Sequence, residues 1–120
     1  MKTQQEVFDI VANHLLTQNA RANISSGPCL YRAPNGCKCA FGILIPDSIY
    51  HPSMEFRSAI SVIREYAEAF HSIGINDIDH GLLCNSLQHI HDSVPVSAWK
   101  EELKACANFY SLNSEVLDKY

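Results

Sequence analysis

Apolar residues recur at every third or fourth position over most of this chain, which is the spacing of one buried face of an α-helix. The first such stretch follows Thr3, which stands three residues before Glu6 as in a capping box. Its apolar positions are Val7, Phe8, Val11 and Leu15. The pattern predicts a first helix that ends at the turn-prone segment 19–23.

Three further stretches have the same periodicity. They predict helices over residues 54–73, 76–93 and 97–110, with one short helical turn in 113–120. Each helix has a boundary signal: Gly74 suits a C-terminal end, Asn76 and Ser97 can cap N-termini, and Pro95 stops a helix. Helices therefore account for most of the predicted structure.

Residues 29–45 follow a different pattern, in which two strand-like runs flank a turn signal. Leu30-Tyr31 and residues 41–45 suit strands, and Asn35-Gly36 between them favours the positive φ angles of a tight hairpin turn. The chain is therefore predicted to have an α+β fold: a mostly helical single domain over residues 1–120, with about four helices and one small antiparallel β-hairpin at about 29–45. An isolated hairpin is marginal in water, so we expect it to pack on the helices or to pair its edge with a second copy in a homo-oligomer.

The composition limits the classes of function. A chain of 120 residues with 47% hydrophobic and 18% charged residues matches one globular domain. Its net charge of −4 argues against binding to extended nucleic acid, because that binding depends on Lys and Arg at phosphates. No apolar run is long enough to span a membrane, and residues 1–6 lack the apolar core of a signal peptide. We therefore expect a cytoplasmic protein with reduced cysteines and no membrane contact.

The predicted hairpin register suggests a reactive cysteine. With a two-residue turn at Asn35-Gly36, Arg32 lies opposite Cys39, and a guanidinium beside a thiol favours the thiolate. His91 is the candidate base for a Cys39 nucleophile in a cysteine-dependent hydrolase or transferase. Asp92 is poorly placed to orient the His91 ring, because adjacent helical residues point about 100° apart. The alternative is that Cys39 is a small core residue and that the Arg32 side chain extends past it to solvent. This alternative favours a protein that is not an enzyme.

Metal binding is a second use of the six histidines and five cysteines. His80 and Cys84 lie four residues apart on one predicted helical face, but two ligands do not complete a site. Cys29, Cys37 and Cys39 lack the Cys-x-x-Cys spacing of a zinc ribbon. We therefore expect no metal and no cofactor.

A small nucleotide pocket is the third candidate chemistry. Arg32, Lys38 and Arg57 can contact phosphate, and Tyr31 and Phe41 can stack on a base. No spacing enforces such a pocket, and the two aromatic residues also suit the core.

Five segments of the chain together form a distinctive pattern. They are YRAPNGCKCAFG at 31–42, IPD at 45–47, YHPSME at 50–55, LQHIHD at 87–92 and Trp99. The pattern resembles that of a family of small hypothetical proteins common in bacteriophages and prophages, over roughly residues 29–110. Cys37 stands where that family's pattern has a variable residue. The resemblance implies an origin in a mobile element and brings no assigned activity and no catalytic residues.

Small phage accessory proteins often act by binding, which needs only a surface. We therefore expect a non-catalytic phage or prophage accessory protein that binds a host or defence component, as an anti-defence inhibitor does, in the cytoplasm of the bacterial host. One alternative is a sponge that sequesters a nucleotide signal in the basic and aromatic pocket. The other is the cysteine-dependent hydrolase or transferase that uses Cys39 and His91.

Overall fold

The computed structural model describes residues 1–23 and 29–120, in which the regular secondary structure is helical. The α-helices are α1 (Gln4–Gln18), α2 (Ala59–Glu65), α3 (Ala67–Ser72), α4 (Asp77–Ser93) and α5 (Trp99–Phe109). Short 3-10 helices lie at Gly42–Leu44, Pro52–Met54, Val96–Ala98 and Glu115–Lys119. The last of these confirms the turn predicted for the tail, whereas the helix predicted from Ser97 begins only at Trp99, after a 3-10 turn.

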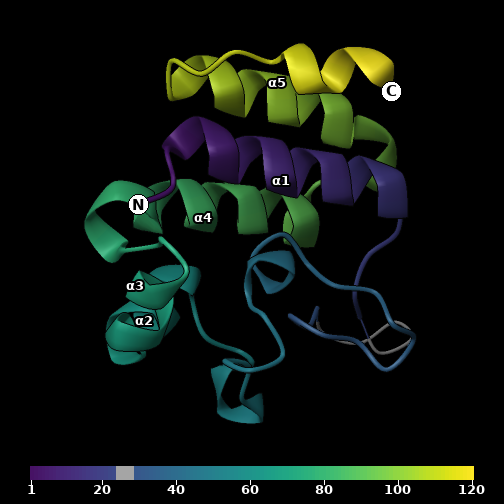
Figure 1. Cartoon of the computed structure of the whole chain (residues 1–120). Coiled ribbons are helices and arrows are strands. Elements are labelled where there is room, and N and C mark those ends of the chain that lie inside the picture. The colour runs from purple at the N-terminus through teal and green to yellow at the C-terminus, as the bar shows by residue number, and fades with distance from the viewer. Residues whose placement is uncertain (24–28) are drawn as a thin grey trace.

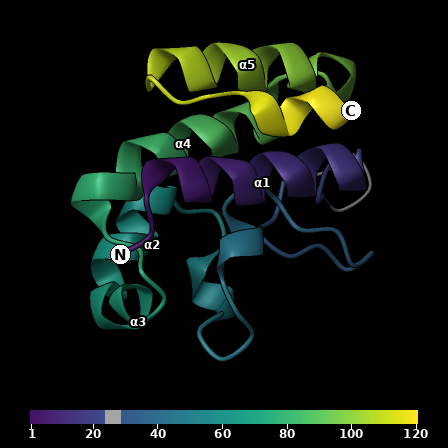
Figure 2. The ribbon, with the colours of Figure 1, turned by 45° about the horizontal axis from the view of Figure 1, so that its top comes forward.

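Figures 1 and 2 show α1, α4 and α5 side by side, with α1 in contact with both of the others. The 3-10 helix Glu115–Lys119 returns beside α5 and contacts α1. Segment 29–58, which is mostly without regular structure, lies on the side of α1 away from α5, and α2 packs on α4. The largest buried side chains of the core between these parts include Phe8, Phe41, Phe70 and Trp99.

The boundaries of α1 and α4 follow the predicted capping signals. Thr3 Oγ1 accepts the backbone N–H of Glu6, and the Glu6 carboxylate accepts the N–H of Thr3, which completes the capping box. Asn76 Oδ1 accepts the N–H of Asp79 at the start of α4, and this helix ends before Pro95. Both helices are therefore confirmed, together with the residues that cap them.

The helix predicted over 54–73 is wrong in its extent. It begins only at Ala59, after the N-cap Ser58, and it breaks at Tyr66 into α2 and α3. Tyr66 has φ −108° and ψ 39°, outside the helical region, and its hydroxyl group hydrogen-bonds Ser53 Oγ at 2.8 Å. This contact ties the break to the preceding loop, and apolar periodicity does not report such contacts.

The predicted β-hairpin at 29–45 is also wrong, and with it the α+β fold class, because the described residues contain no β-strand. Two isolated antiparallel bridges take its place, Asn23 with Cys29 and Arg32 with Lys38. Arg32 therefore lies opposite Lys38 and not opposite Cys39. A homo-oligomer that pairs hairpin edges loses its structural basis in the described residues.

Two features prevent a regular β-ladder in this segment. The turn closes where the N–H of Ala33 donates to the carbonyl of Cys37 at 2.9 Å, so the loop is longer than the predicted two residues. The second apolar run then folds into a 3-10 helix, in which Gly42 approaches Tyr31 very closely. A Cβ at position 42 would lie 2.1 Å from the Tyr31 carbonyl oxygen. The segment therefore turns back on itself instead of extending.

Side chains from α1 and α4 satisfy backbone groups that a β-ladder would otherwise pair. Gln18 Oε1 accepts the Lys38 N–H at 2.9 Å. Gln18 Nε2 and His14 Nε2 donate to the Lys38 carbonyl at 2.9 and 2.8 Å. From α4, Gln88 Oε1 accepts the Phe41 N–H at 3.0 Å. The irregular segment is therefore fixed to two helices by directed hydrogen bonds.

Glu55 holds the same segment from within the irregular region. One carboxylate oxygen accepts the N–H of Tyr31 at 2.7 Å, and the other accepts the N–H of Arg32 at 3.2 Å. The Tyr50 hydroxyl donates to the second oxygen at 2.6 Å. A carboxylate only accepts hydrogen bonds, so it suits position 55, where two backbone N–H groups and one hydroxyl group donate.

We predict that Glu55→Gln destabilises the fold by about 1–3 kcal/mol, because the amide nitrogen that replaces one carboxylate oxygen cannot accept the backbone N–H bound there. Urea denaturation measures the change in the free energy of unfolding. Glu68→Gln is the matched control, because Glu68 is exposed on α3. Equal unfolding midpoints for the two variants would contradict the role of Glu55.

Candidate functional site

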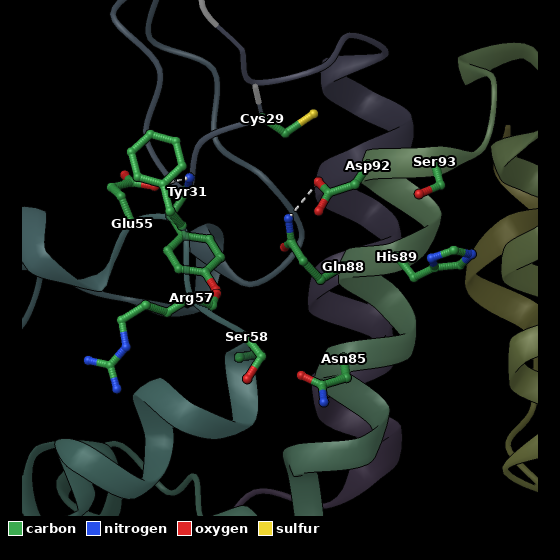
Figure 3. A pocket seen from close by; sticks show the side chains of 12 residues that line it. Cys29, Tyr31, Glu55, Arg57, Ser58, Asn85, Gln88, His89, Asp92 and Ser93 are labelled. Carbon is green, nitrogen blue, oxygen red and sulfur yellow. Dashed lines mark hydrogen bonds between the residues drawn. The ribbon is translucent and has the colours of Figure 1, made fainter. Parts of the chain in front are cut away.

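A cavity of about 370 Å³ opens between α4 and a facing wall made of residues 29–31 and 55–58 of the irregular region and Ala59 at the start of α2 (Figure 3). Helix α4 contributes Asn85, Gln88, His89 and Asp92, and the facing wall includes Cys29, Tyr31, Phe56 and Arg57. The volume is at the small end of the range for ligand sites. Its lining includes several polar side chains, among them Glu55, Asn85, Gln88, His89 and Asp92.

Helical periodicity places the α4 side chains on one face of the cavity. Positions 85, 88, 89 and 92 recur at intervals of three and four residues, and so lie above one another along the helix. The other face of α4 carries Leu83, Leu87 and Ile90 into the core. Because this apolar face is buried in the core, the polar face of α4 is directed toward the cavity.

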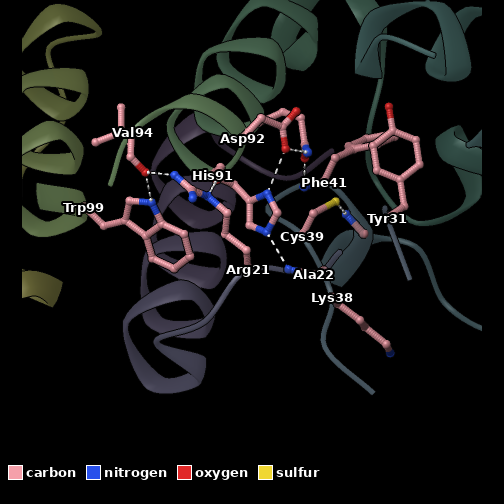
Figure 4. Close-up of polar contacts among 12 residues, drawn as sticks. Arg21, Ala22, Tyr31, Lys38, Cys39, Phe41, His91, Asp92, Val94 and Trp99 are labelled. Carbon is pink, nitrogen blue, oxygen red and sulfur yellow. Dashed lines mark hydrogen bonds and ion pairs between the residues drawn. The ribbon is translucent and has the colours of Figure 1, made fainter. Parts of the chain in front are cut away.

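Asp92 connects the cavity to the interior of the protein. Its Oδ1 accepts hydrogen bonds from Gln88 Nε2 and from His91 Nδ1, both at 2.8 Å. The expectation that Asp92 is poorly placed to orient the His91 ring is therefore wrong: the two side chains at the end of α4 turn toward each other (Figure 4). The Asp92 side chain keeps 39% of its surface exposed.

His91 is fully buried and acts as an anchor for the backbone after α1. Its Nε2 accepts the N–H of Ala22 at 3.0 Å, so the ring proton is on Nδ1 and donates to Asp92. The ring stacks on Trp99 with 5.6 Å between centroids. Arg21 adds bonds to the carbonyl groups of His91 and Val94 at the end of α4 (Figure 4). Both ring nitrogens of His91 are thus in use.

Cys39 lies close to Gln88 and Asp92, but it is a buried core residue. Its sulfur accepts the N–H of Gly42 at 3.1 Å. Burial raises the pKa of the Cys39 thiol far above its usual range. Among the described residues no hydrogen bond joins it to His91. The arrangement thus lacks the thiolate–base pair that a cysteine hydrolase needs.

Arg32 is engaged away from the cysteine. Its guanidinium pairs with Asp47 at 2.8 Å, donates to the Ile45 carbonyl at 2.9 Å and lies 4.3 Å from the centre of the Tyr50 ring. The side chain of Arg32 therefore clamps the 45–50 loop.

Cys29 is the thiol that the structure brings to His91 and Asp92. The sulfur, an imidazole nitrogen and a carboxylate oxygen lie within 4.8 Å of one another. Burial raises the pKa of the Cys29 thiol, the charge of Asp92 and a hydrogen bond to its carboxylate raise it further, and Arg21 lowers it. The thiol is therefore held in its protonated form. Sequence reasoning missed this cluster because Cys29 and His91 are 62 residues apart in the chain, and no local spacing indicates that they meet.

The same three groups are close enough to share a divalent metal ion, but their hydrogen bonds oppose it. Ligation through His91 Nδ1 would move the ring proton to Nε2, where it would face the N–H of Ala22. The other predicted ligands are also occupied. His80 accepts the Asn76 N–H at 3.0 Å and donates to the Lys2 carbonyl at 2.7 Å, and burial raises the pKa of the Cys84 thiol to about 12.

The residues predicted to bind a nucleotide do not form one site in the described structure. Tyr31 and Arg57 line the cavity, whereas its described lining does not include Arg32, Lys38 or Phe41. The rings of Tyr31 and Phe41 are buried against each other at 5.4 Å, so neither offers an open face for a base.

Comparison with protein-family models, with curated proteins and with solved structures finds no match for this chain. Across residues 1–23 and 29–120, none of the helices combines the length and the apolar character needed to cross a membrane.

We predict that Asp92→Asn lowers the pKa of Cys29, because it removes a nearby negative charge. At a fixed pH below that pKa, the thiolate fraction and the rate of alkylation by iodoacetamide rise about tenfold for each unit by which the pKa falls. Mass spectrometry of the Cys29 peptide gives the rate across pH, with Cys37 as internal reference. The asparagine keeps an acceptor for Gln88 and His91.

Glu101→Gln is the control for this experiment, since it removes one charge from an exposed position on α5. It should leave the Cys29 profile unchanged. An identical profile for Asp92→Asn would show that the carboxylate does not act on the thiol.

Proposed function

We propose that this protein is a non-catalytic accessory protein that binds a partner protein through the exposed ridge of α4. The α4 ridge consists of Ile78, Leu82, Asn85 and His89, which repeat at helical spacing along the outer face of the helix. The proposal depends chiefly on one observation: at Asn85 and His89 a hollow lies on each side of the ridge, and these two residues line both hollows. One is the cavity described above.

The second hollow lies between α4 and α5. It has a volume of about 440 Å³ and is lined on the α5 side by Glu102, Ala105 and Cys106. It is less polar than the first, so the ridge separates a polar recess from a more apolar one. A protruding ridge with recesses on either side suits a partner that supplies complementary side chains to both.

Large apolar side chains on this part of the molecule remain in solvent. Ile78 is 90% exposed, Leu82 67% and Phe109 81%. A hydrogen bond of 2.8 Å between the hydroxyl groups of Tyr110 and Ser86 holds the end of α5, which carries Phe109, close to α4. Exposed apolar side chains that gather in one region favour an interaction surface.

The chemistry of the thiols supports binding over catalysis. The pKa values of the Cys29 and Cys39 thiols are raised, and His91 uses both ring nitrogens to hold the structure. The resemblance to small phage and prophage proteins supports a host or defence protein in the bacterial cytoplasm as the partner. A second copy of this chain is the competing occupant of the ridge.

We predict that Leu82→Glu abolishes capture of the partner while the fold is retained, because the leucine is exposed and glutamate suits a helix. Tagged protein immobilised in bacterial lysate is compared with the variant by quantitative mass spectrometry. Ile10→Glu is the matched control: Ile10 is 39% exposed and lies on α1.

One stoichiometric partner should be recovered by the wild type and by Ile10→Glu, and lost with Leu82→Glu. Equal recovery by both variants would overturn the proposed surface. Light scattering distinguishes self-association, since a dimer that Leu82→Glu converts to monomer would identify the occupant as a second copy.

A further inference from the structure

We propose that the cavity beside α4 receives an arginine side chain of the partner protein, with Asp92 as its counter-ion and Phe56 as the aromatic surface against it. The inference rests on the proposed function, because the cavity borders the α4 ridge and shares Asn85 and His89 with it. It adds the chemistry that recognises the partner.

Phe56 is the first observation that supports this proposal. Its φ is 63°, in the left-handed region that bulky residues rarely adopt, and its side chain is 73% exposed at the cavity. Neighbouring contacts enforce this conformation: Glu55 binds two backbone N–H groups, and the carbonyl of Arg57 accepts the Tyr31 hydroxyl. The fold therefore holds an aromatic ring in solvent at some cost in backbone energy, which suggests a role in recognition.

Asp92 is the second observation. The ion pairs of Lys and Arg in the described residues are Arg32 with Asp47, Arg57 with Glu65 and Arg64 with Asp77, so none neutralises Asp92. The partners of Asp92 are a neutral amide, the Cys29 thiol and a histidine whose Nε2 accepts a hydrogen bond. Its charge acts within the cavity, because it contributes to the raised pKa of Cys29.

The cationic side chain of the cavity wall points elsewhere. Figure 3 shows the guanidinium of Arg57 directed away from Asp92 and α4, and this group pairs with Glu65. Glu55 adds a second carboxylate to the lining. Arg21 also acts on Cys29, but its guanidinium is bound to the carbonyl groups of His91 and Val94 and it is not in the described lining. The lining therefore presents a net negative charge to an occupant, in a protein of net charge −4. A phosphate would be repelled and a cation attracted.

Arginine fits these observations better than the other cations a partner offers. Its planar guanidinium donates hydrogen bonds to a carboxylate and also stacks on an aromatic ring, whereas lysine presents a compact charge with no flat face. Asp92 and Phe56 supply the two matching surfaces. The cavity of about 370 Å³ is large enough for one such side chain.

The test uses N-acetyl-argininamide as the probe, titrated into the ¹⁵N-labelled full chain and followed by NMR. We predict saturable shifts at the side-chain amides of Asn85 and Gln88. The uncharged isostere N-acetyl-citrullinamide should not bind. Asp92→Asn should weaken binding about tenfold or more, as expected for a lost hydrogen bond to a charged group, whereas Asp118→Asn, at an exposed position in the tail, should not change it.

Phe56→Gly separates recognition from folding. Glycine is relaxed at a positive φ, so this variant should be at least as stable as the wild type in urea denaturation, yet bind the probe several-fold more weakly. A loss of stability would show that the ring is structural and overturn its proposed role. Equal binding of the citrulline analogue, or the absence of saturable shifts, would overturn the arginine site; saturable binding of guanosine monophosphate in its place would identify a nucleotide site.

Leu82→Glu distinguishes failure of this inference from failure of the proposed function. Leu82 belongs to the ridge but not to the described lining of the cavity, so the variant should retain probe binding. Partner capture by the wild type with no probe binding would overturn the arginine site alone. Probe binding with partner capture that survives Leu82→Glu would overturn the ridge alone.

Discussion

The structure depends on the need to satisfy buried backbone groups in a segment that forms no β-ladder. Residues 29–45 cross the face of α1 and α4 with two isolated bridges, Asn23 with Cys29 and Arg32 with Lys38, in place of a ladder. Buried N–H and C=O groups without hydrogen-bond partners would raise the free energy of the folded state and oppose the gain from apolar contacts. Gln18, Gln88 and Glu55 supply the missing partners, and the segment keeps its position because these side chains are themselves fixed.

The need to pair buried backbone groups also explains why some predicted functional residues have structural roles. Arg32 and His91 were candidates for ligand binding and catalysis, but both stabilise the fold. Arg32 pairs with Asp47 in the 45–50 loop, and His91 accepts the N–H of Ala22 after α1. The cavity residues that keep exposed aromatic or polar surface include Phe56, His89 and Asp92. The proposed binding chemistry therefore uses side chains that keep surface toward solvent, among them Asp92, which also accepts hydrogen bonds from Gln88 and His91.

The helices α1 and α4 were predictable because their signals are local. The capping box at Thr3 and the Asn76 cap act within one turn, and apolar periodicity reports a buried face directly. The hairpin was not predictable from local preference: strand-forming residues at 41–45 meet a tertiary environment that offers helix side chains instead of a strand partner. The cavity joins Cys29 to Asp92, and no local spacing encodes that contact.

Helix α4 has a thermodynamic consequence beyond its place in the packing. Its side chains serve two tasks, since Asn85, Gln88 and His91 accept backbone N–H groups of neighbouring segments while His89 is exposed. A partner that binds only the folded molecule at the proposed surface adds its binding free energy to the stability of the irregular region. On this proposal, hydrogen exchange at the amides of Ala22 and Phe41 slows when the partner is bound, so these two amide protons would report occupancy from inside the molecule.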